Sequence, residues 1–252
     1  EPVSKLDGHV AVITGGKGAI GWATAKRLAA LGARIVSIDR SEPEKVQALL
    51  DSLPKVASGA HFALTASITD TAALNAAADA VKQRAGRCDI LVNSAGFTKP
   101  VAANDLEGLT DELFDEVVQT NLRGVFATIR AFTPLLKANG DGLIVNVSSI
   151  AGFTGAGSNL AYAASKAGVD VLTKGLAKAL APQVRVIAVS PGVVDSSFVP
   201  GRGADFNDKA AATIPLKRIG HVDDTAATIE ACATTLRFAT GSRFVVDGGR
   251  SL

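Results

Sequence analysis

Short apolar runs alternate with longer amphipathic segments along most of the 252-residue chain. The apolar runs have the length and β-branched content of strands buried on both faces, and the longer segments have a helical period. This alternation is typical of a parallel sheet with helical crossovers. The predicted strands are 9–13, 35–38, 61–66, 89–92, 143–147, 185–189 and 243–246, and the predicted helices are 22–31, 43–53, 70–85, 111–137, 159–180 and 222–236.

The predicted fold class is therefore α/β, a doubly wound sheet of seven mainly parallel strands flanked by helices. No polar linker interrupts the pattern, so residues 1–252 are expected to form a single domain. Residues 197–216 carry little pattern, and two interpretations stay open for them: a mobile lid over a substrate, or an ordinary long surface loop.

A glycine-rich turn, TGGKGAIG at 14–21, joins the first strand to the first helix. In that order, strand, turn and helix form an anion site, because helix amides point outward and glycine admits a pyrophosphate close to the backbone. Asp39 ends the second strand about twenty residues further on, where a carboxylate can bind an adenosine ribose. The sequence thus predicts a dinucleotide site.

The candidate chemistry lies between 142 and 166. An apolar strand there delivers Ser149 at its carboxyl end, and Tyr162 and Lys166 follow four residues apart, on one face of a predicted helix. A free tyrosine has a pKa of about 10, and a neighbouring ammonium favours the phenolate. We expect Lys166 to lower the pKa of Tyr162, the only tyrosine in the chain, so that it acts as a general acid or base.

Ser149, Tyr162 and Lys166 resemble the Ser…Tyr-x-x-x-Lys set of the short-chain dehydrogenase/reductase family, in its 3-oxoacyl-reductase-like subgroup. Further motifs agree in order across 9–249, although Ala19 replaces the middle glycine of the family's turn. That turn should tolerate alanine unless the position has a positive φ. The resemblance implies a Rossmann fold, catalytic residues Asn121, Ser149, Tyr162 and Lys166, and cofactor contacts from Gly15, Lys17, Ile20, Gly21, Asp39, Arg40, Ser67, Ile68, Asn93, Ala95, Gly96, Tyr162, Lys166, Pro191, Gly192, Val194 and Ser196.

The implied activity is hydride transfer between a nicotinamide cofactor and a secondary alcohol or ketone. Ser149 would hold the substrate oxygen, Tyr162 would exchange the proton, and a helix irregularity at Asn121 would hold a water beside Lys166. Residues Phe97, Thr98, Ile150, Gly152, Phe153 and Gly157 are expected, with 197–216, to line an apolar pocket for an uncharged substrate. The alternative is a catalytically silent dinucleotide sensor or scaffold with the same fold.

NAD is the predicted cofactor and NADP the less favoured one, because Asp39 can bind both ribose hydroxyls and repels a 2′-phosphate. Arg40 and Lys17 could attract that phosphate, or could be ordinary solvated cations. The resemblance also implies a homotetramer in which helices 111–137 and 159–180 pack across one two-fold axis and the C-terminal strand packs across another.

Composition narrows the function classes. The net charge of +2 comes from scattered residues, so there is no basic stripe for nucleic acid. No apolar run reaches the ~20 residues of a membrane span, and no signal-peptide pattern is present, so a cytoplasmic protein is expected. The two cysteines and three histidines are scattered and show no metal-ligand spacing. Because the two cysteines are far apart in sequence, reduced thiols are favoured over a disulfide.

Overall fold

The computed structural model describes residues 5–252, and residues 1–4 of the predicted domain lie outside the described residues. Within that range the strands form one seven-stranded sheet of order β3-β2-β1-β4-β5-β6-β7. Every pairing is parallel, which confirms the doubly wound α/β prediction. The strands are β1 (Val10–Thr14), β2 (Arg34–Asp39), β3 (Phe62–Thr65), β4 (Ile90–Asn93), β5 (Gly142–Val147), β6 (Val184–Pro191) and β7 (Arg243–Val246).

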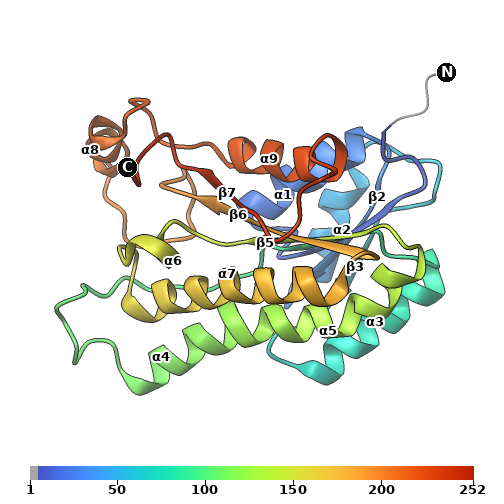
Figure 1. The fold of residues 1–252 in the computed structure, drawn as a ribbon, viewed down its shortest axis with the longest axis horizontal. Coiled ribbons are helices and arrows are strands. Elements are labelled where there is room, and N and C mark those ends of the chain that lie inside the picture. The colour runs from blue at the N-terminus through green and yellow to red at the C-terminus, as the bar shows by residue number, and fades with distance from the viewer. Residues whose placement is uncertain (1–4) are drawn as a thin grey trace.

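Helices cover both faces of the sheet (Figure 1). On one face pack α3 (Thr71–Ala85), α5 (Gly124–Ala138) and α7 (Leu160–Leu180), and on the other pack α1 (Ala19–Ala30), α2 (Pro43–Asp51) and α9 (Val222–Thr234). The predicted helix 111–137 is α4 (Asp111–Val118), a π-helical segment η1 (Gln119–Arg123) and α5 in succession. None of the helices within residues 5–252 is both long and apolar enough to cross a bilayer.

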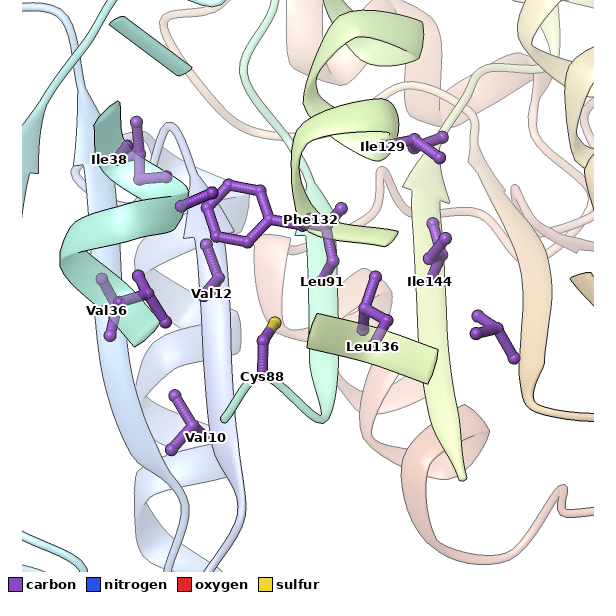
Figure 2. Close-up of a cluster of buried hydrophobic side chains, with 14 of the residues drawn as sticks. Val10, Val12, Val36, Ile38, Cys88, Leu91, Ile129, Phe132, Leu136 and Ile144 are labelled. Carbon is purple, nitrogen blue, oxygen red and sulfur yellow. The ribbon is translucent and has the colours of Figure 1, made fainter. Parts of the chain in front are cut away.

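One of the two main apolar cores lies between the sheet and the α3–α5–α7 layer. Figure 2 shows Phe132 of α5 pointing toward Val12 of β1 and Leu91 of β4, with Cys88 below them. All four side chains are almost completely buried. Burying an apolar side chain of this size contributes roughly 1.5–3 kcal/mol, so this layer fixes the position of α5 and α7 against the strands that carry the site.

Two short helices lie where none was predicted, α6 (Ala151–Thr154) and α8 (Phe206–Thr213). The second lies inside the 197–216 segment, which was expected to lack regular structure. An alanine triplet at 210–212 favours helix, and Asp205 forms an ion pair with Lys209 one turn later. Ala210 and Ile214 are buried, so α8 packs onto the protein through a narrow apolar face.

Because all the strands are parallel, their carboxyl ends lie at one edge of the sheet. The predicted motif residues lie there: Gly15 directly follows β1, Asp39, Asn93 and Pro191 end β2, β4 and β6, and Ser149 is the second residue after β5. The strand order reverses between β1 and β4, where Thr14 pairs with Asn93. A doubly wound sheet binds ligands at such a crevice, so the fold brings the predicted motifs to one place.

Candidate active site

A cavity of about 1150 Å³ lies at this edge. It extends from the glycine turn and the end of β2, past the loops after β4 and β6, to the residues after β5 and the α7 side chains. Of the predicted catalytic and cofactor residues, it is lined by Gly15, Lys17, Ile20, Gly21, Asp39, Arg40, Ser67, Ile68, Ala95, Gly96, Ser149, Tyr162, Lys166, Pro191, Gly192, Val194 and Ser196.

The glycine turn is built around Gly15. Its φ of +67° disfavours other residues, and a Cβ there would lie 2.9 Å from the Ala95 Cα. Its N–H donates to the Ile38 carbonyl at 2.8 Å, which fixes the turn against β2. Ala19 is the first residue of α1, and it is not among the non-glycine residues of 5–252 that have a positive φ. The alanine substitution therefore leaves the turn intact.

The start of α1 faces the cavity through Gly18, Ala19, Ile20 and Gly21. Gly18 is the N-cap and provides no side chain to the first-turn amides. Unpaired amides at a helix N-terminus attract an anion such as a pyrophosphate. Together with a buried carboxylate at the adjacent strand end, this chemistry fits a dinucleotide cofactor.

That carboxylate belongs to Asp39, which is 6% exposed. It accepts hydrogen bonds from the Lys17 N–H at 3.2 Å and the Ser37 hydroxyl at 2.5 Å, so it is held toward the turn. The Lys17 ammonium forms an ion pair with Glu42 at 2.6 Å. Arg40 is exposed beside the cavity. This end of the cavity thus presents a fixed negative charge, with the Lys17 ammonium already paired with Glu42.

Three side chains that resemble the family's catalytic set meet at the opposite end. Ser149 follows β5, and its Oγ accepts the Ala151 N–H at 3.1 Å. The Ser149 hydroxyl lies close enough to the Tyr162 phenol to lower the pKa of Tyr162, against the larger effect of burial. The N-cap residue of α7, Asn159, accepts the Tyr162 N–H through Oδ1 at 2.7 Å, which places the tyrosine in the first helical turn. Lys166 follows one turn later, its Nζ 5.6 Å from the Tyr162 ring centre.

Burial dominates the protonation of both groups. It raises the pKa of Tyr162 to about 12, against smaller lowering effects from the Ser149 hydroxyl and the Arg202 charge. It lowers the pKa of Lys166 to about 8, against a raising effect of Asp170. The predicted lowering of the Tyr162 pKa by Lys166 is therefore not found in this structure. Burial penalises the charged form of each side chain, and the Lys166 ammonium donates to the Val147 carbonyl at 2.8 Å.

Asn93 differs from its predicted position at the cofactor. It is 3% exposed and does not line the cavity. Its Nδ2 donates to Asn146 Oδ1 at 2.9 Å, across the neighbouring strand β5. Side chains alternate along a strand, and Asn93 turns into the interior, so the cavity is lined by the next residues, Ser94 to Phe97.

Asn121 is likewise buried outside the cavity lining. The predicted helix irregularity is confirmed, because Asn121 is the central residue of the π-helical segment η1. Its side chain accepts the Phe97 N–H at 2.9 Å and donates to the Phe97 carbonyl at 2.6 Å. Asn121 therefore holds the loop after β4 in place, a contact that the sequence did not indicate.

The predicted substrate residues divide into two groups. Phe97, Ile150 and Gly157 line the cavity, and Thr98, Gly152 and Phe153 do not. Thr98 is buried against Ser158 and Asn159. A Cβ at Gly152 would lie 2.9 Å from the Lys166 backbone, so Gly152 packs α6 onto α7. Phe153 lies under the Arg243 guanidinium at 4.0 Å.

Several lining residues were not singled out from the sequence. Phe198 packs beside Tyr162 with ring centres 6.1 Å apart. Arg202 and Phe206 lie in or next to α8, and Arg250 follows the last strand. The Arg and Phe residues carry no spacing signal relative to Tyr162. The 197–216 segment was expected to line the pocket, and its folding over the sheet edge brings Phe198, Arg202 and Phe206 to the cavity. Arg250 reaches the cavity from the chain after β7.

The comparisons with known proteins agree with this geometry. The family model described as enoyl-(acyl carrier protein) reductase matches residues 15–251. The chain is 35% identical over 250 residues to the 3-oxoacyl-(acyl-carrier-protein) reductase FabG of Thermotoga maritima, covering 97% of this chain and 98% of that protein. The structure of levodione reductase has a TM-score of 0.90 at 30% identity, covering 98% of each chain. A dehydrogenase/reductase from Sinorhizobium meliloti 1021 has a TM-score of 0.88 at 33% identity, covering 99% and 98%.

The chain therefore belongs to the short-chain dehydrogenase/reductase family, and it is a 3-oxoacyl-reductase-like member. Members of this family are NAD(P)-dependent oxidoreductases that act on alcohols and carbonyl compounds. The chain is accordingly an oxidoreductase that transfers a hydride between a nicotinamide cofactor and a secondary alcohol or ketone.

Proposed function

We propose that the protein reduces a ketone to a secondary alcohol, with Tyr162 as the general acid, Ser149 as the group that orients the carbonyl, and Lys166 beside them. The observation that carries this proposal is that Ser149, Tyr162 and Lys166 line the same cavity as Asp39 and the glycine turn, with the Lys166 Nζ 5.6 Å from the Tyr162 ring centre. The Ser149 and Tyr162 hydroxyls offer two donors to one carbonyl oxygen.

A bound nicotinamide would supply or accept the hydride. The chain's own residues would manage the oxygen and its proton. With a pKa raised to about 12, the Tyr162 phenol is protonated at neutral pH and can donate to an oxygen that gains negative charge. That state supports reduction as the direction near pH 7. Lys166 lies beside the same ring, with its ammonium hydrogen-bonded to the Val147 carbonyl, and would hold the nicotinamide ribose.

The test is Tyr162→Phe, which removes the phenol and keeps the ring that packs on Phe198. General acid catalysis contributes roughly 10²- to 10⁴-fold, so kcat should fall by that factor while the Kd of the reduced cofactor stays unchanged. Near wild-type kcat on a working ketone would contradict the assignment. If the wild type bound cofactor but oxidised none of it across a broad ketone panel, the silent-sensor alternative would gain.

We infer that the cofactor is NAD rather than NADP. Two hydrogen bonds fix the Asp39 carboxylate at the proposed ribose end, where its negative charge would repel a 2′-phosphate. At about 4 Å and an effective dielectric near 20, repulsion between two unit charges is about 4 kcal/mol before screening. Lys17 is paired with Glu42, which leaves Arg40 as the cation that could soften this repulsion.

Measuring kcat/KM with each cofactor tests this inference. The wild type should have the higher kcat/KM with NAD. Asp39→Ala should lower the NAD-to-NADP ratio of kcat/KM, because it removes the repulsion of the 2′-phosphate. Arg40→Gln is the matched control, because it removes the opposite charge at the same end and should widen the ratio. A higher kcat/KM with NADP in the wild type would show that Arg40 outweighs Asp39.

We further propose a cytoplasmic homotetramer. Cys88 and Cys232 are both buried free thiols, a state typical of reducing compartments. The helices expected at the first two-fold axis carry exposed apolar side chains: Phe114 on α4, Phe126 on α5 and Val171 on α7. The edge strand β7 carries Val245, 43% exposed, where the second contact is expected. Assembly would cover both sets.

A further inference from the structure

Arg202 is a cation at the substrate end of a cavity that the sequence suggested would be apolar. It lines the cavity together with Ser149 and Tyr162. The charge of Arg202 acts on the Tyr162 phenol. Burial has the largest effect on the Tyr162 pKa and raises it, whereas Ser149 and then Arg202 lower it. Arg202 therefore lies on the side of the cavity where the carbonyl would react.

The Arg202 side chain is held in place by two contacts. Its Nη1 donates to the Val194 carbonyl at 2.9 Å, on the loop after β6 that would cover the nicotinamide. Its guanidinium also lies 4.5 Å from the centre of the Phe206 ring, at the start of α8. An arginine fixed this way has lost part of its rotamer freedom before any ligand arrives, so less entropy is lost on binding.

Most of the guanidinium's bonding capacity is unused. Within residues 5–252, Arg202 forms no ion pair and makes no hydrogen bond besides the one to Val194. Asp195, whose charge raises the Arg202 pKa, is exposed and accepts a hydrogen bond from Asn207 at 3.2 Å instead of pairing with the guanidinium. Burial lowers the Arg202 pKa, because the charge is partly desolvated, and the charge of Asp195 offsets this effect only in part.

A second guanidinium reaches the same cavity from the other end of α8. Arg250 donates from Nη1 to Thr213 Oγ1 at 2.8 Å, and both residues line the cavity. The chain's C-terminal end lies next to α8 (Figure 1). Between Phe206 and Thr213 the helix makes about two turns, roughly 10 Å. The two arginines thus give one wall of the cavity a positive character.

We propose that Arg202 binds a carboxylate of the substrate, so that the physiological substrate is an oxo acid, or the corresponding hydroxy acid, rather than a neutral ketone or thioester. This proposal rests on the proposed function, because it places the carbonyl of the same molecule at Ser149 and Tyr162. A guanidinium matches a carboxylate with two parallel N–H···O bonds. Phe198 and Phe206 would pack on the carbon chain between the two ends.

The test compares oxo acids with their methyl esters, which keep the carbonyl and lose the charge. A panel of 2-, 3- and 4-oxo acids of four to eight carbons is titrated into the protein with oxidised cofactor bound, a complex that cannot reduce the ketone, and isothermal titration calorimetry gives each Kd. A hydrogen-bonded charge pair corresponds to roughly 10- to 100-fold in affinity, so at least one acid should bind that much more tightly than its ester. The same ratio is measured in kcat/KM.

Arg202→Gln should reduce the acid-to-ester ratio to about 1, and Arg202→Lys should give an intermediate ratio because it keeps the charge without the fork. Lys209→Gln is the matched control, since it removes an exposed cation from α8 outside the cavity and should leave the ratio unchanged. Because the ester shares every other contact, an effect of Arg202 on the Tyr162 pKa acts on both ligands and cancels in the ratio.

The proposal would be overturned if the wild type bound no acid better than its ester, or if Arg202→Gln weakened the binding of acid and ester equally. It would also be overturned if Arg202→Gln weakened cofactor binding and left the acid-to-ester ratio unchanged. That last result would assign Arg202 to a cofactor phosphate. The two proposals fail separately. Arg202-dependent binding of the acid can persist even if Tyr162→Phe keeps its turnover, and loss of turnover in Tyr162→Phe can occur with no preference for acids.

Discussion

Tyr162 and Lys166 show how burial prepares two ionisable groups for one proton transfer. The low-polarity surroundings oppose charge on each, so the phenol keeps its proton to about pH 12 and the ammonium loses its proton near pH 8. The sequence indicated the pair correctly, because their spacing of four is a local property of a helix. The direction of the pKa shift depends on burial at the cavity floor, which the sequence motif does not describe.

The cost of burying the Lys166 ammonium should be visible in stability. In the unfolded chain Lys166 has its ordinary pKa of 10.5, and in the fold about 8. Below pH 8 both states carry the charge and the fold bears the full cost; between pH 8 and 10.5 only the unfolded state binds the proton, so stability rises with pH. Each pKa unit is about 1.4 kcal/mol, so the whole effect is about 3 kcal/mol.

Lys166→Met removes this dependence. The difference in unfolding free energy between variant and wild type, from urea titrations without cofactor, should shift in favour of the wild type by about 3 kcal/mol from pH 8 to 10.5. Loss of the Val147 hydrogen bond adds an offset that does not vary with pH. Lys174→Met, at an exposed lysine of the same helix, controls for charge removal. A pH-independent difference for Lys166→Met would contradict the burial argument.

Helix starts position the reactive groups, and two of them offer a matched comparison. Asn159 caps α7 by accepting the Tyr162 N–H at 2.7 Å, and Asp70 caps α3 by accepting the Ala73 N–H at 3.0 Å. Removing an N-cap side chain costs about 1 kcal/mol. Asn159 also donates to the Lys99 carbonyl at 2.9 Å, so it joins the catalytic helix to the loop after β4.

Both Asn159→Ala and Asp70→Ala should therefore lower the free energy of unfolding by about 1 kcal/mol or slightly more. Asn159→Ala should in addition lower kcat by roughly tenfold or more, because small misplacement of a reacting group is costly. Asp70→Ala should keep kcat. Chemical denaturation and steady-state kinetics on the same preparations check the pair. Equal kcat for the two variants would show that the cap does not position Tyr162.

The same elements show what a sequence pattern can and cannot predict. Strand ends, the glycine turn and the Ser149–Tyr162–Lys166 set follow from hydrophobic period and motif spacing, both of which are local. Three other features depend on which segments come together after folding. Asn93 points into the interior, Asn121 binds the Phe97 backbone, and Arg202 binds the Val194 carbonyl. Helix α8 was missed because its apolar face consists of little more than Ala210 and Ile214.

Across the whole protein, parallel strand order turns scattered motifs into one site. Reversal of the order between β1 and β4 opens the crevice, and the loops after β5 and β6 close its far end. One end of the cavity carries the acid Asp39, and the opposite end carries the guanidinium of Arg202. This charge arrangement suits the proposed NAD at one end and the proposed anionic substrate at the other.

The outer surface of the helical layer is expected to form one of the two-fold contacts of the tetramer. Val171 on α7 is 70% exposed, although α7 also carries Tyr162 and Lys166 on its inner side. If α7 packs across a two-fold axis, each Val171→Asp substitution places a charge at a self-complementary contact twice. Uncompensated charge in an apolar contact is strongly unfavourable, so the variant should dissociate at concentrations where the wild type is tetrameric.

Leu106→Asp is the control, because Leu106 is 71% exposed and lies outside the helices expected at the axis. Sedimentation velocity at micromolar concentration should show wild type and Leu106→Asp as tetramers, and Val171→Asp as a smaller species with unchanged helical content. A wild-type monomer would refute the assembly. A tetramer that persists in Val171→Asp would place the two-fold contact elsewhere, and the exposed apolar side chains Phe114 and Phe126 would then need another partner.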